Sequence, residues 1–304
     1  MFLGIDTSNY TTSVALYDGK NIIQKKKMLT VKNGEKGLRQ SEAVFQHVIN
    51  MPELLKELEL NDVTAVGVSV TPRSVEGSYM PCFKVGELTA QSISSALNIP
   101  LYKTSHQTGH ILAALYSANR LDLIDSEHVA FHLSGGTTEG LIVKPDNSEI
   151  IKAEIVSSSL DLKAGQAIDR AGVMLGLDFP CGKMLDKLSC KSDTEFKYKP
   201  SMIGMDCSMS GVENKAKKLL DEGCSAEDIS KFVLTCVSNT VVSMLSQIIN
   251  KYGELPVIFS GGVSSNTLLR KKVKEKYSNV HFAEPEFSLD NAAGCAIYAY
   301  MKDR

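Results

Sequence analysis

The sequence predicts an α/β protein built from two related halves. A three-stranded meander with a hairpin turn opens the chain, and the same pattern returns past the middle. In both copies the first corner is small and rich in hydroxyl groups. Strands and helices then alternate, which indicates two α/β halves that face one another. The strands of the two meanders are expected at residues 2–5, 12–17 and 21–25, and at residues 128–133, 138–143 and 149–155.

Hydrophobic periodicity predicts the remaining elements along the chain. The helices are expected at residues 41–58, 84–97, 106–116, 165–175, 225–251, 264–277 and 291–301. The buried strands between them are expected at residues 65–70, 101–103 and 257–260. The segment 188–209 shows no clear period, so we expect a loop or a small excursion there.

The composition is that of a globular protein with two domains. Of the 304 residues, 43% are hydrophobic and 22% are charged, which is enough apolar material for a sizeable core. The formal net charge of −2 excludes the broad basic surface of a protein that coats nucleic acid. Contact with RNA would need a local patch, for which residues 25–27 and the basic run 270–276 are candidates. The alternative for each is a solvated face, which charge runs commonly form.

Cysteine usage and apolar runs predict a cytoplasmic protein without a membrane anchor. The seven cysteines include no Cys-x-x-Cys pair, so we expect reduced thiols and neither a disulfide framework nor a zinc ribbon. The N-terminus lacks the basic leader and long apolar run of a signal peptide. Polar residues interrupt the longest apolar stretch, residues 232–249, which favours a buried helix over a membrane span. Ser225 suits the N-cap of that helix.

Two histidines one helical turn apart, His106 and His110, form the first candidate site. On a helix, residues i and i+4 lie on one face, so both imidazoles can bind one metal ion. The alternative is a pair of buried histidines satisfied by backbone carbonyls. Spacing alone leaves both interpretations open.

Two glycine corners and an acidic segment form a second candidate site, for a nucleotide. The corner at 134–138 lies between two strands, where backbone amides and hydroxyls can contact a phosphate. The corner at 260–266 lies where a strand enters a helix, whose N-terminus attracts anions. The segment 161–169 carries two aspartates that could accept from ribose hydroxyls; the alternative for any one of these motifs is an ordinary turn. The candidate residues are Ser134, Gly135, Gly136, Thr137, Asp161, Gly165, Asp169, Gly261, Gly262 and Asn266.

Seven ordered motifs over nearly the whole chain resemble those of one family, the tRNA threonylcarbamoyladenosine synthases, long labelled glycoproteases. The motifs are Gly4-Ile5-Asp6-Thr7-Ser8, His106-x-x-Gly109-His110, Ser134-Gly135-Gly136-x-Thr138, Gly165-x-Ala167-x-Asp169, Ser208-x-Ser210-Gly211, Gly261-Gly262-Val263-Ser264-x-Asn266 and Asp290-Asn291. This resemblance implies the duplicated actin-like ATPase fold, which is shared by actin, sugar kinases and Hsp70. The first half would then comprise residues 1–120, completed by residues 287–304, and the second half residues 121–286.

The resemblance also implies a metal centre. The family binds its metal through the two helix histidines and an aspartate near the C-terminus, which correspond here to His106, His110 and Asp290. Some members add a tyrosine just before the Ser-Gly-Gly corner, where this chain has His132. The four residues would suit iron or zinc. The alternative for His132 is an inward-facing strand histidine.

The function implied by the resemblance is a metal-dependent transferase in which His106, His110 and Asp290 are catalytic. The family binds threonylcarbamoyl-AMP between its halves and passes the carbamoyl group to the exocyclic amine of a tRNA adenosine. The expected cofactors are one divalent metal ion, iron or zinc, and an adenine nucleotide, threonylcarbamoyl-AMP or ATP. The expected partners are tRNA, a non-catalytic homologue and a small ATPase. A Lewis-acid metal would polarise the carbonyl group, and the cleft would align the reactants.

Three departures from the family pattern keep other functions open. Thr108 replaces an acid between the histidines, Tyr10 and Thr11 replace an acidic pair, and residues 71–77 replace a glycine-proline-glycine loop. These changes fit a divergent paralogue with a different acceptor or acyl group, or one with a regulatory role. A metallopeptidase ranks last, because Gln107 stands where such an enzyme keeps its general base. A sugar kinase would not need the histidine pair.

Overall fold

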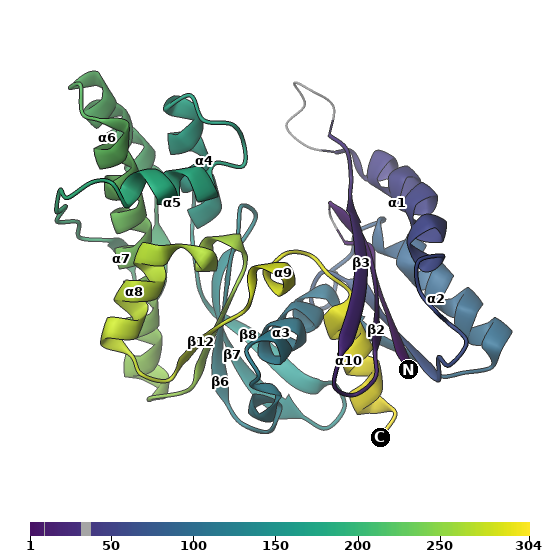
Figure 1. The fold of residues 1–304 in the computed structure, drawn as a ribbon. Coiled ribbons are helices and arrows are strands. Elements are labelled where there is room, and N and C mark those ends of the chain that lie inside the picture. The colour runs from purple at the N-terminus through teal and green to yellow at the C-terminus, as the bar shows by residue number, and fades with distance from the viewer. Residues whose placement is uncertain (9, 32–37) are drawn as a thin grey trace. The chain divides into compact units, whose positions relative to one another are not determined.

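Two compact units make up the computed structural model, which describes residues 1–8, 10–31 and 38–304 (Figure 1). Unit 1 comprises Met1–Ile124, Pro145–Lys152 and Glu286–Arg304; unit 2 comprises Asp125–Lys144 and Ala153–Pro285. The predicted division placed residues 145–152 in the second half, whereas they pack with unit 1. Tyr298 donates a hydrogen bond of 3.0 Å to Glu149 there, and Lys302 donates one of 2.8 Å to the Ser148 carbonyl.

Unit 1 contains a mixed five-stranded sheet with the order β3-β2-β1-β4-β5. Its strands are β1 (Phe2–Asp6), β2 (Thr11–Tyr17), β3 (Ile22–Met28), β4 (Ala65–Thr71) and β5 (Leu101–Ser105). The first three strands pair antiparallel as the predicted meander, and β4 and β5 continue the sheet in parallel. Two helices lie on each face (Figure 1). They are α1 (Gln40–Leu55) and α2 (Phe83–Leu97) on one face, and α3 (His106–Ser117) and α10 (Ala293–Lys302) on the other.

The alternation of side chains along β1 explains how unit 1 receives helices on both faces. Leu3 and Ile5 point into the apolar core with side chains of α1. Gly4 points to the other face, where an added Cβ would lie 2.2 Å from the Ala292 carbonyl oxygen. On the paired strand β4, a Cβ at Gly67 would lie 2.0 Å from the Cys295 carbonyl oxygen. The two glycines therefore let α10 lie directly on the sheet.

Unit 2 repeats the sheet of unit 1 strand for strand, with the order β12-β11-β6-β7-β8. Its strands are β6 (His128–Leu133), β7 (Thr138–Asp146), β8 (Ile150–Ser158), β11 (Val257–Ser260) and β12 (Val280–Phe282). As in unit 1, the first strand pairs antiparallel with the second and parallel with the fourth, and the fourth pairs parallel with the fifth. The predicted duplication of an α/β half is confirmed.

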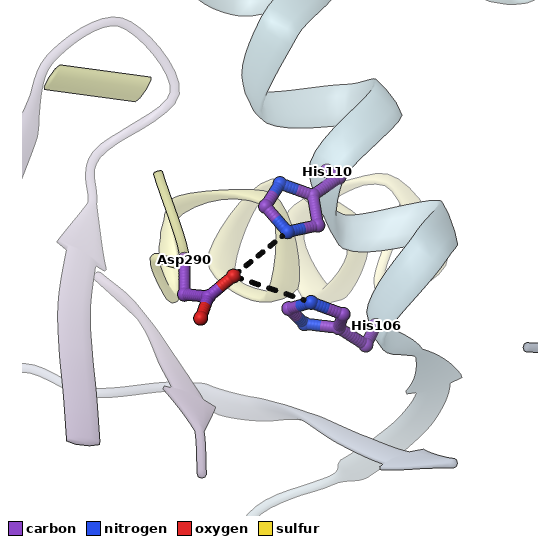
Figure 2. Close-up of side chains that lie close together, drawn as sticks. All are labelled: His106, His110 and Asp290. Carbon is purple, nitrogen blue, oxygen red and sulfur yellow. Dashed lines mark hydrogen bonds and ion pairs between the residues drawn. The ribbon is translucent and has the colours of Figure 1, made fainter. Parts of the chain in front are cut away.

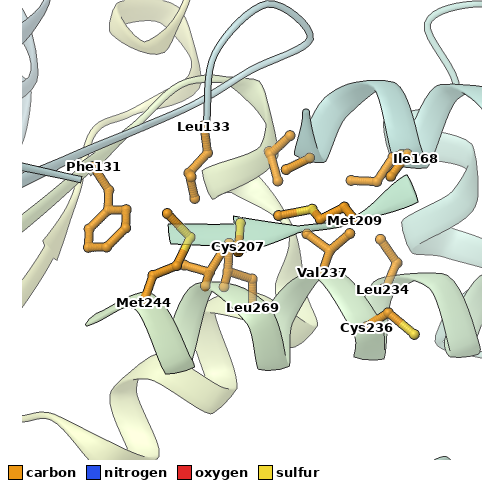
Figure 3. Close-up of a cluster of buried hydrophobic side chains, with 14 of the residues drawn as sticks. Phe131, Leu133, Ile168, Cys207, Met209, Leu234, Cys236, Val237, Met244 and Leu269 are labelled. Carbon is orange, nitrogen blue, oxygen red and sulfur yellow. The ribbon is translucent and has the colours of Figure 1, made fainter. Parts of the chain in front are cut away.

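Helix α7 (Ala226–Tyr252) is the centre of the unit 2 core. Val237 and Met244 on this helix pack in one apolar cluster with Phe131 and Leu133 of the sheet (Figure 3). The helix is long and apolar enough to cross a membrane, yet 67% of its most apolar window is buried inside the protein. The prediction of a buried helix is confirmed, and Ser225 caps it as expected.

Smaller elements complete the chain. They are η1 (Leu121–Asp125), α4 (Ala164–Met174), α5 (Gly182–Ser189), β9 (Ser201–Ile203), β10 (Asp206–Ser208), α6 (Ser210–Asp221), η2 (Gly262–Ser265), α8 (Thr267–Lys276) and α9 (Pro285–Ser288). The segment 188–209, predicted as a loop or small excursion, contains the hairpin of β9 and β10. All seven cysteines are free thiols, as the sequence predicts.

Candidate metal centre and glycine corners

The two predicted histidines lie at the start of α3. Ser105 ends β5 and caps the helix, because its Oγ accepts from the Thr108 amide at 3.2 Å. His106 is therefore the first helical residue and His110 follows one turn later. Their ring centroids are 4.3 Å apart, and Figure 2 shows both rings on the same side of the helix. The predicted helical spacing brings them together.

Asp290 meets both histidines with one carboxylate oxygen (Figure 2). Its Oδ1 lies 3.3 Å from Nε2 of His110 and 3.6 Å from Nε2 of His106. Asn291 fixes this segment: its amide donates to the Leu289 carbonyl at 2.7 Å, and its oxygen accepts from the Ala293 amide at 3.1 Å. His106, His110 and Asp290 each offer one ligand atom, and these three atoms lie within 4.8 Å of one another.

A glycine contact between α3 and α10 sets the distance of Asp290 from the histidines. An added Cβ at Gly294 would lie 1.8 Å from the carbonyl oxygen of Gly109. The helices can touch through backbone only because position 294 has no side chain. Gly109 lies directly before His110, and Gly294 follows Asp290 by four residues. The helix contact and the ligand group are therefore one structural feature.

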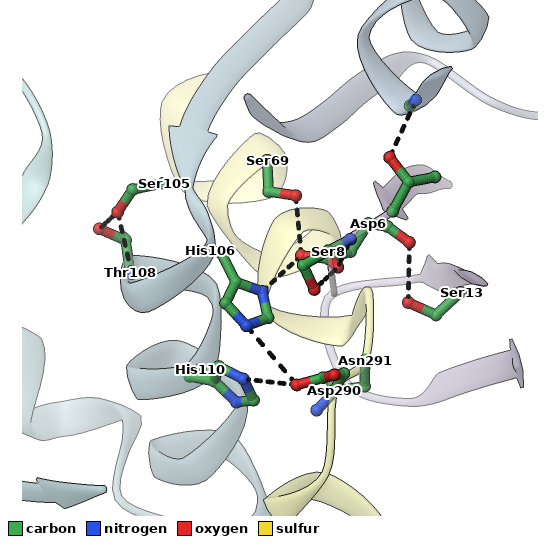
Figure 4. A network of polar contacts seen from close by, with 12 residues as sticks. Asp6, Ser8, Ser13, Ser69, Ser105, His106, Thr108, His110, Asp290 and Asn291 are labelled. Carbon is green, nitrogen blue, oxygen red and sulfur yellow. Dashed lines mark hydrogen bonds and ion pairs between the residues drawn. The ribbon is translucent and has the colours of Figure 1, made fainter. Parts of the chain in front are cut away.

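A second carboxylate, Asp6, holds the other side of His106 (Figure 4). Its Oδ2 lies 2.8 Å from Nδ1 of His106 and accepts from Ser69 Oγ at 2.7 Å. Its Oδ1 accepts from the amide of Ser8 at 2.9 Å and also from the Ser8 hydroxyl. Asp6 and Ser69 were not among the site residues predicted from the sequence. The signal for Asp6 was strand alternation, which puts it on the same face as Gly4, toward α10.

The two carboxylates determine the charge of the histidines. Burial by itself lowers the pKa of His106, but the Asp6 and Asp290 carboxylates outweigh burial and raise that pKa to about 10. Burial and the charge of His106 lower the pKa of His110. Burial would raise the pKa of both aspartates, but the adjacent histidines hold each below its ordinary value. This environment stabilises positive charge at the point where the three side chains meet, whether a proton or a metal ion carries it.

The donor set fits a divalent transition metal. Two imidazole nitrogens and a carboxylate oxygen are the ligands found in open sites for zinc or for non-haem iron. A histidine ligand also needs a partner for its other ring nitrogen, which Asp6 provides for His106. His132 belongs to unit 2, where its Nδ1 lies 3.2 Å from Ser260 Oγ. Its place in the ligand set stays a prediction.

The two glycine corners meet at the end of β6 in unit 2. A Cβ at Gly165 would lie 2.6 Å from the Gly135 amide nitrogen, and a Cβ at Gly261 would lie 2.2 Å from the Leu133 carbonyl oxygen. Gly261 also has a positive φ of 87°. The Ser134 hydroxyl accepts from the Thr137 amide at 3.1 Å, which closes the first corner. By contrast, a Cβ would meet open space at Gly135, Gly136 and Gly262.

The polar residues predicted beside the corners already have partners within unit 2. The Asp161 carboxylate accepts from the amides of Met209 at 2.8 Å and Ser210 at 3.2 Å, so it ties the start of α6 to the segment before α4. Asp169 accepts from the Cys181 amide at 2.8 Å. Asn266 caps α8, with its Oδ1 2.9 Å from the Leu269 amide. Their direct contact with a nucleotide stays a prediction.

Both basic runs proposed as RNA patches make contacts within their own units. Lys25 and Lys27 pair with Glu57 and Glu53 at 3.0 and 2.6 Å. On α8, the Arg270 guanidinium lies 5.0 Å from the centre of the Phe282 ring. Two lysines of that run bond to helix α7: Lys272 to Asn239 and Lys276 to Ser246, at 2.5 and 2.7 Å. Neither run is a row of unpaired cations.

The departures from the family pattern lie in α3, at the start of β2 and in the loop after β4. Thr108 turns to the helix cap, with its Oγ1 3.0 Å from Ser105 Oγ, and leaves the ligand group complete. The Tyr10 carbonyl accepts from the Leu29 amide at 2.8 Å, and Thr11 begins β2. The replaced loop touches the start of α3, because the Pro72 carbonyl accepts from the Gln107 amide at 3.1 Å.

Solved structures that match nearly the whole chain identify its fold. HypF from T. kodakarensis matches with a TM-score of 0.63 and 12% identity, over 99% of this chain and 47% of that chain. Component A of (R)-2-hydroxyglutaryl-CoA dehydratase from Acidaminococcus fermentans matches with a TM-score of 0.58 and 17% identity, over 99% and 98%. A ROK family glucokinase from Streptomyces griseus matches with a TM-score of 0.54 and 12% identity, also over 99% and 98%. The predicted actin-like ATPase fold is confirmed.

Sequence comparison identifies the family, which the structural matches do not. The tRNA N6-adenosine threonylcarbamoyltransferase of Neorickettsia sennetsu (strain ATCC VR-367 / Miyayama) is 28% identical over 311 residues, covering 96% of this chain and 91% of that protein. A family model described as TsaD, tRNA N6-adenosine threonylcarbamoyltransferase, matches residues 21–297. The match covers both units and includes the two histidines and Asp290. The chain therefore belongs to the TsaD family of tRNA N6-adenosine threonylcarbamoyltransferases, and it is a transferase.

Proposed function

We propose that this protein transfers a threonylcarbamoyl group from threonylcarbamoyl-AMP to the N6 amine of a tRNA adenosine. The observation that carries the proposal is the convergence of His106, His110 and Asp290 in a member of a transferase family. An exocyclic amine is a poor nucleophile and AMP is a good leaving group. The reaction therefore depends on polarising the carbonyl group and on aligning the two substrates.

His106, His110 and Asp290 would hold one iron or zinc ion. When bound, such an ion supplies Lewis-acid polarisation of a carbonyl or phosphoryl oxygen. The protein keeps the three ligands in place through the Ser105 cap of α3 and through the Gly294 contact with α3. Asp6 orients the His106 ring from the opposite side.

The adenylate part of the donor would bind at the glycine corners of unit 2. Backbone approaches backbone there without side chains between, at Gly165 beside Gly135 and at Gly261 beside Leu133, and Gly135 and Gly136 leave open space for a ligand. Helix α4 begins beside the first corner, and its N-terminal dipole favours a phosphate. Thr138 accepts from the Ala164 amide at 2.8 Å and so fixes the start of α4 against the corner.

The family and the chemistry of the donor support the proposed acceptor. A tRNA adenosine supplies the amine, and the free thiols of all seven cysteines are compatible with work in the cytoplasm. We include a non-catalytic homologue and a small ATPase as partners of the reaction. The near-zero net charge makes help with RNA binding from a partner physically reasonable.

The test is a transfer assay with the full chain, loaded with zinc or ferrous iron, and supplied with threonylcarbamoyl-AMP, tRNA and the partner proteins. The product is modified adenosine, detected by mass spectrometry of the digested tRNA. We expect His110→Ala and Asp290→Ala to lower the rate by about 10²–10³-fold. His281→Ala is the matched control, because this unit 2 histidine contacts Asn279 and lies outside the ligand group. Full activity in the two ligand variants would overturn the proposed metal centre.

A second candidate keeps the donor and changes the acceptor. The observation in its favour is the loop 71–77, which differs from the family pattern and contacts the start of α3 at Gln107. The same assay distinguishes the two, because AMP release is measured alongside tRNA modification. AMP release that depends on a different amine, with unmodified tRNA, would identify a paralogue with another acceptor.

A further inference from the structure

We propose that Asp6 is a positioning residue for the metal centre: it holds the proton on Nδ1 of His106, so that Nε2 faces the metal ion. The inference rests on the metal centre of the proposed function. It assigns a role to an aspartate at the end of β1 that offers no ligand atom to the group of three.

The hydrogen bonds of Asp6 decide its protonation state. Oδ1 accepts from the Ser8 amide, which can only donate, and from the Ser8 hydroxyl. Oδ2 lies 2.7 Å from Ser69 Oγ and 2.8 Å from Nδ1 of His106. An ionised carboxylate can accept all four of these contacts. We take Asp6 as that ionised acceptor, which makes Nδ1 of His106 the donor in the 2.8 Å contact.

The protonated Nδ1 leaves Nε2 as the nitrogen that can bind a metal. A metal binds only the neutral imidazole, so binding displaces one of the two protons of the charged ring. A proton held on Nδ1 by Asp6 leaves Nε2 as the nitrogen that loses its proton and offers a lone pair. In the structure Nε2 of His106 faces Oδ1 of Asp290 at 3.6 Å, the same oxygen that faces His110. The hydrogen bond to Asp6 thus sets both the orientation of the His106 ring and its tautomer.

The surroundings of Asp6 keep it rigid. It is 1% exposed, and its partners Ser8 and Ser69 are 1% and 0% exposed. Ser69 lies on β4, directly beside the end of β1 in the parallel register, so both side chains leave the sheet on the α10 face. A group that is buried and held by two serines cannot turn away from His106 without losing hydrogen bonds.

The substitution Asp6→Asn separates this role from simple packing. An amide has the same shape as the carboxylate but offers an acceptor on one side only. If its oxygen faces Ser8, its NH₂ group faces Nδ1 of His106 and forces that nitrogen to accept. The proton then moves to Nε2 and blocks the metal-binding nitrogen. If the amide turns round, the NH₂ group faces the Ser8 amide, which costs a buried hydrogen bond.

The experiment measures zinc affinity of the full chain by competition with a chromophoric chelator. We expect Asp6→Asn to weaken zinc binding about 10–100-fold. Thr12→Val is the matched control: Thr12 is buried in the same sheet but bonds to His47 on the opposite face, at 2.8 Å. Unchanged zinc affinity in Asp6→Asn, or an equal loss in Thr12→Val, would overturn the inference.

A second measurement needs no variant of Asp6. In the zinc-loaded wild-type chain, nitrogen-resolved NMR of the His106 ring should show a proton on Nδ1 and the metal on Nε2. The reverse assignment would reject the role of Asp6 even if Asp6→Asn fails to fold. Failure of the metal centre itself is a different result: wild-type protein that binds no zinc, or His110→Ala with full zinc affinity.

Discussion

The two units share one strand order, but the end of the first strand carries different chemistry in each. In unit 1 this position is Asp6, and the neighbouring parallel strand places Ser69 beside it at 2.7 Å. In unit 2 the corresponding position is His132, with Ser260 beside it at 3.2 Å. Each unit therefore places a serine from its fourth strand against a polar group at the end of its first strand.

What surrounds this position differs between the units. In unit 1 helix α3 and the segment before α10 lie on the face of Asp6 and bring the three ligand side chains together there, with His106 in contact with Asp6. In unit 2 the strand runs into the Ser134–Gly136 corner, where glycines let backbone segments approach closely instead. The duplicated sheet supplies the positions, and the local residues decide whether side-chain ligands or backbone donors occupy them. Variants that affect one unit only test this difference between the two units.

The largest expected effect is that of Gly294→Ala on metal binding. The new methyl group would lie 1.8 Å from a backbone oxygen of α3, so the helices must separate and Asp290 must move away from the histidines. We expect a destabilisation of about 1–3 kcal/mol and a fall in zinc affinity of at least about tenfold. The measurements are a denaturant melt and the chelator competition.

Gly109→Ala is the control from the same helix contact. Its Cβ would meet the Cys295 sulfur at 3.6 Å, which is an ordinary contact. Alanine is also the better helix former, so this variant should keep its zinc affinity. Equal effects of the two variants would show that the helix contact does not set the ligand geometry.

The next effect is that of Gly165→Ala on nucleotide binding. The added Cβ would lie 2.6 Å from the Gly135 amide and displace the corner from the start of α4. We expect at least a tenfold loss of affinity for a fluorescent adenine nucleotide, with zinc affinity retained. Gly182→Ala is the control, because its Cβ would meet only Ile168, at 3.9 Å. A loss of zinc affinity in Gly165→Ala would show that nucleotide binding in unit 2 and metal binding in unit 1 are not independent.

His132→Ala tests the fourth ligand predicted from the sequence. We expect the variant to keep one zinc ion per chain, because a complete group of three ligands lies within unit 1 alone. The measurement is the metal content after dialysis, compared with that of His106→Ala. A metal loss as large as that in His106→Ala would establish His132 as a ligand. Retention would instead favour a hydrogen-bonding role beside Ser260.

The sequence predicted most of the fold because periodic burial dominates it. The duplicated meander, the buried strands and the long helix α7 all carry strong apolar patterns. Helix α6 was missed, because only Val212 and Ala216 of its twelve residues are buried and the pattern is too weak to recognise. Strand β12 was missed because three residues are too few to show a period.

The candidate site was predicted less completely, and the reason is three-dimensional. The helical spacing of His106 and His110 is local, so it could be recognised directly. The contribution of Asp6 could not, because it depends on a sheet that places residue 6 beside residue 106. Asp161 was predicted from the sequence to accept from ribose, but in the structure its carboxylate accepts from the backbone at the start of α6.

Asp161→Asn gives the smallest expected effect, and its pH dependence distinguishes structure from binding. Burial raises the pKa of Asp161, but donors from Ser208, Met209 and Ser210 outweigh burial and hold it well below the ordinary 3.8. A lowered pKa stabilises the fold above the ordinary value, and this stabilisation is lost as the pH falls through the lowered one. We therefore expect Asp161→Asn to melt a few degrees lower than wild type at pH 7, with the difference shrinking below about pH 4.

Nucleotide affinity of Asp161→Asn should change little, since donors of the protein already engage both carboxylate oxygens. A large loss of affinity with an unchanged melting temperature would make Asp161 a ribose acceptor, and each unit would then use an aspartate near its ligand site.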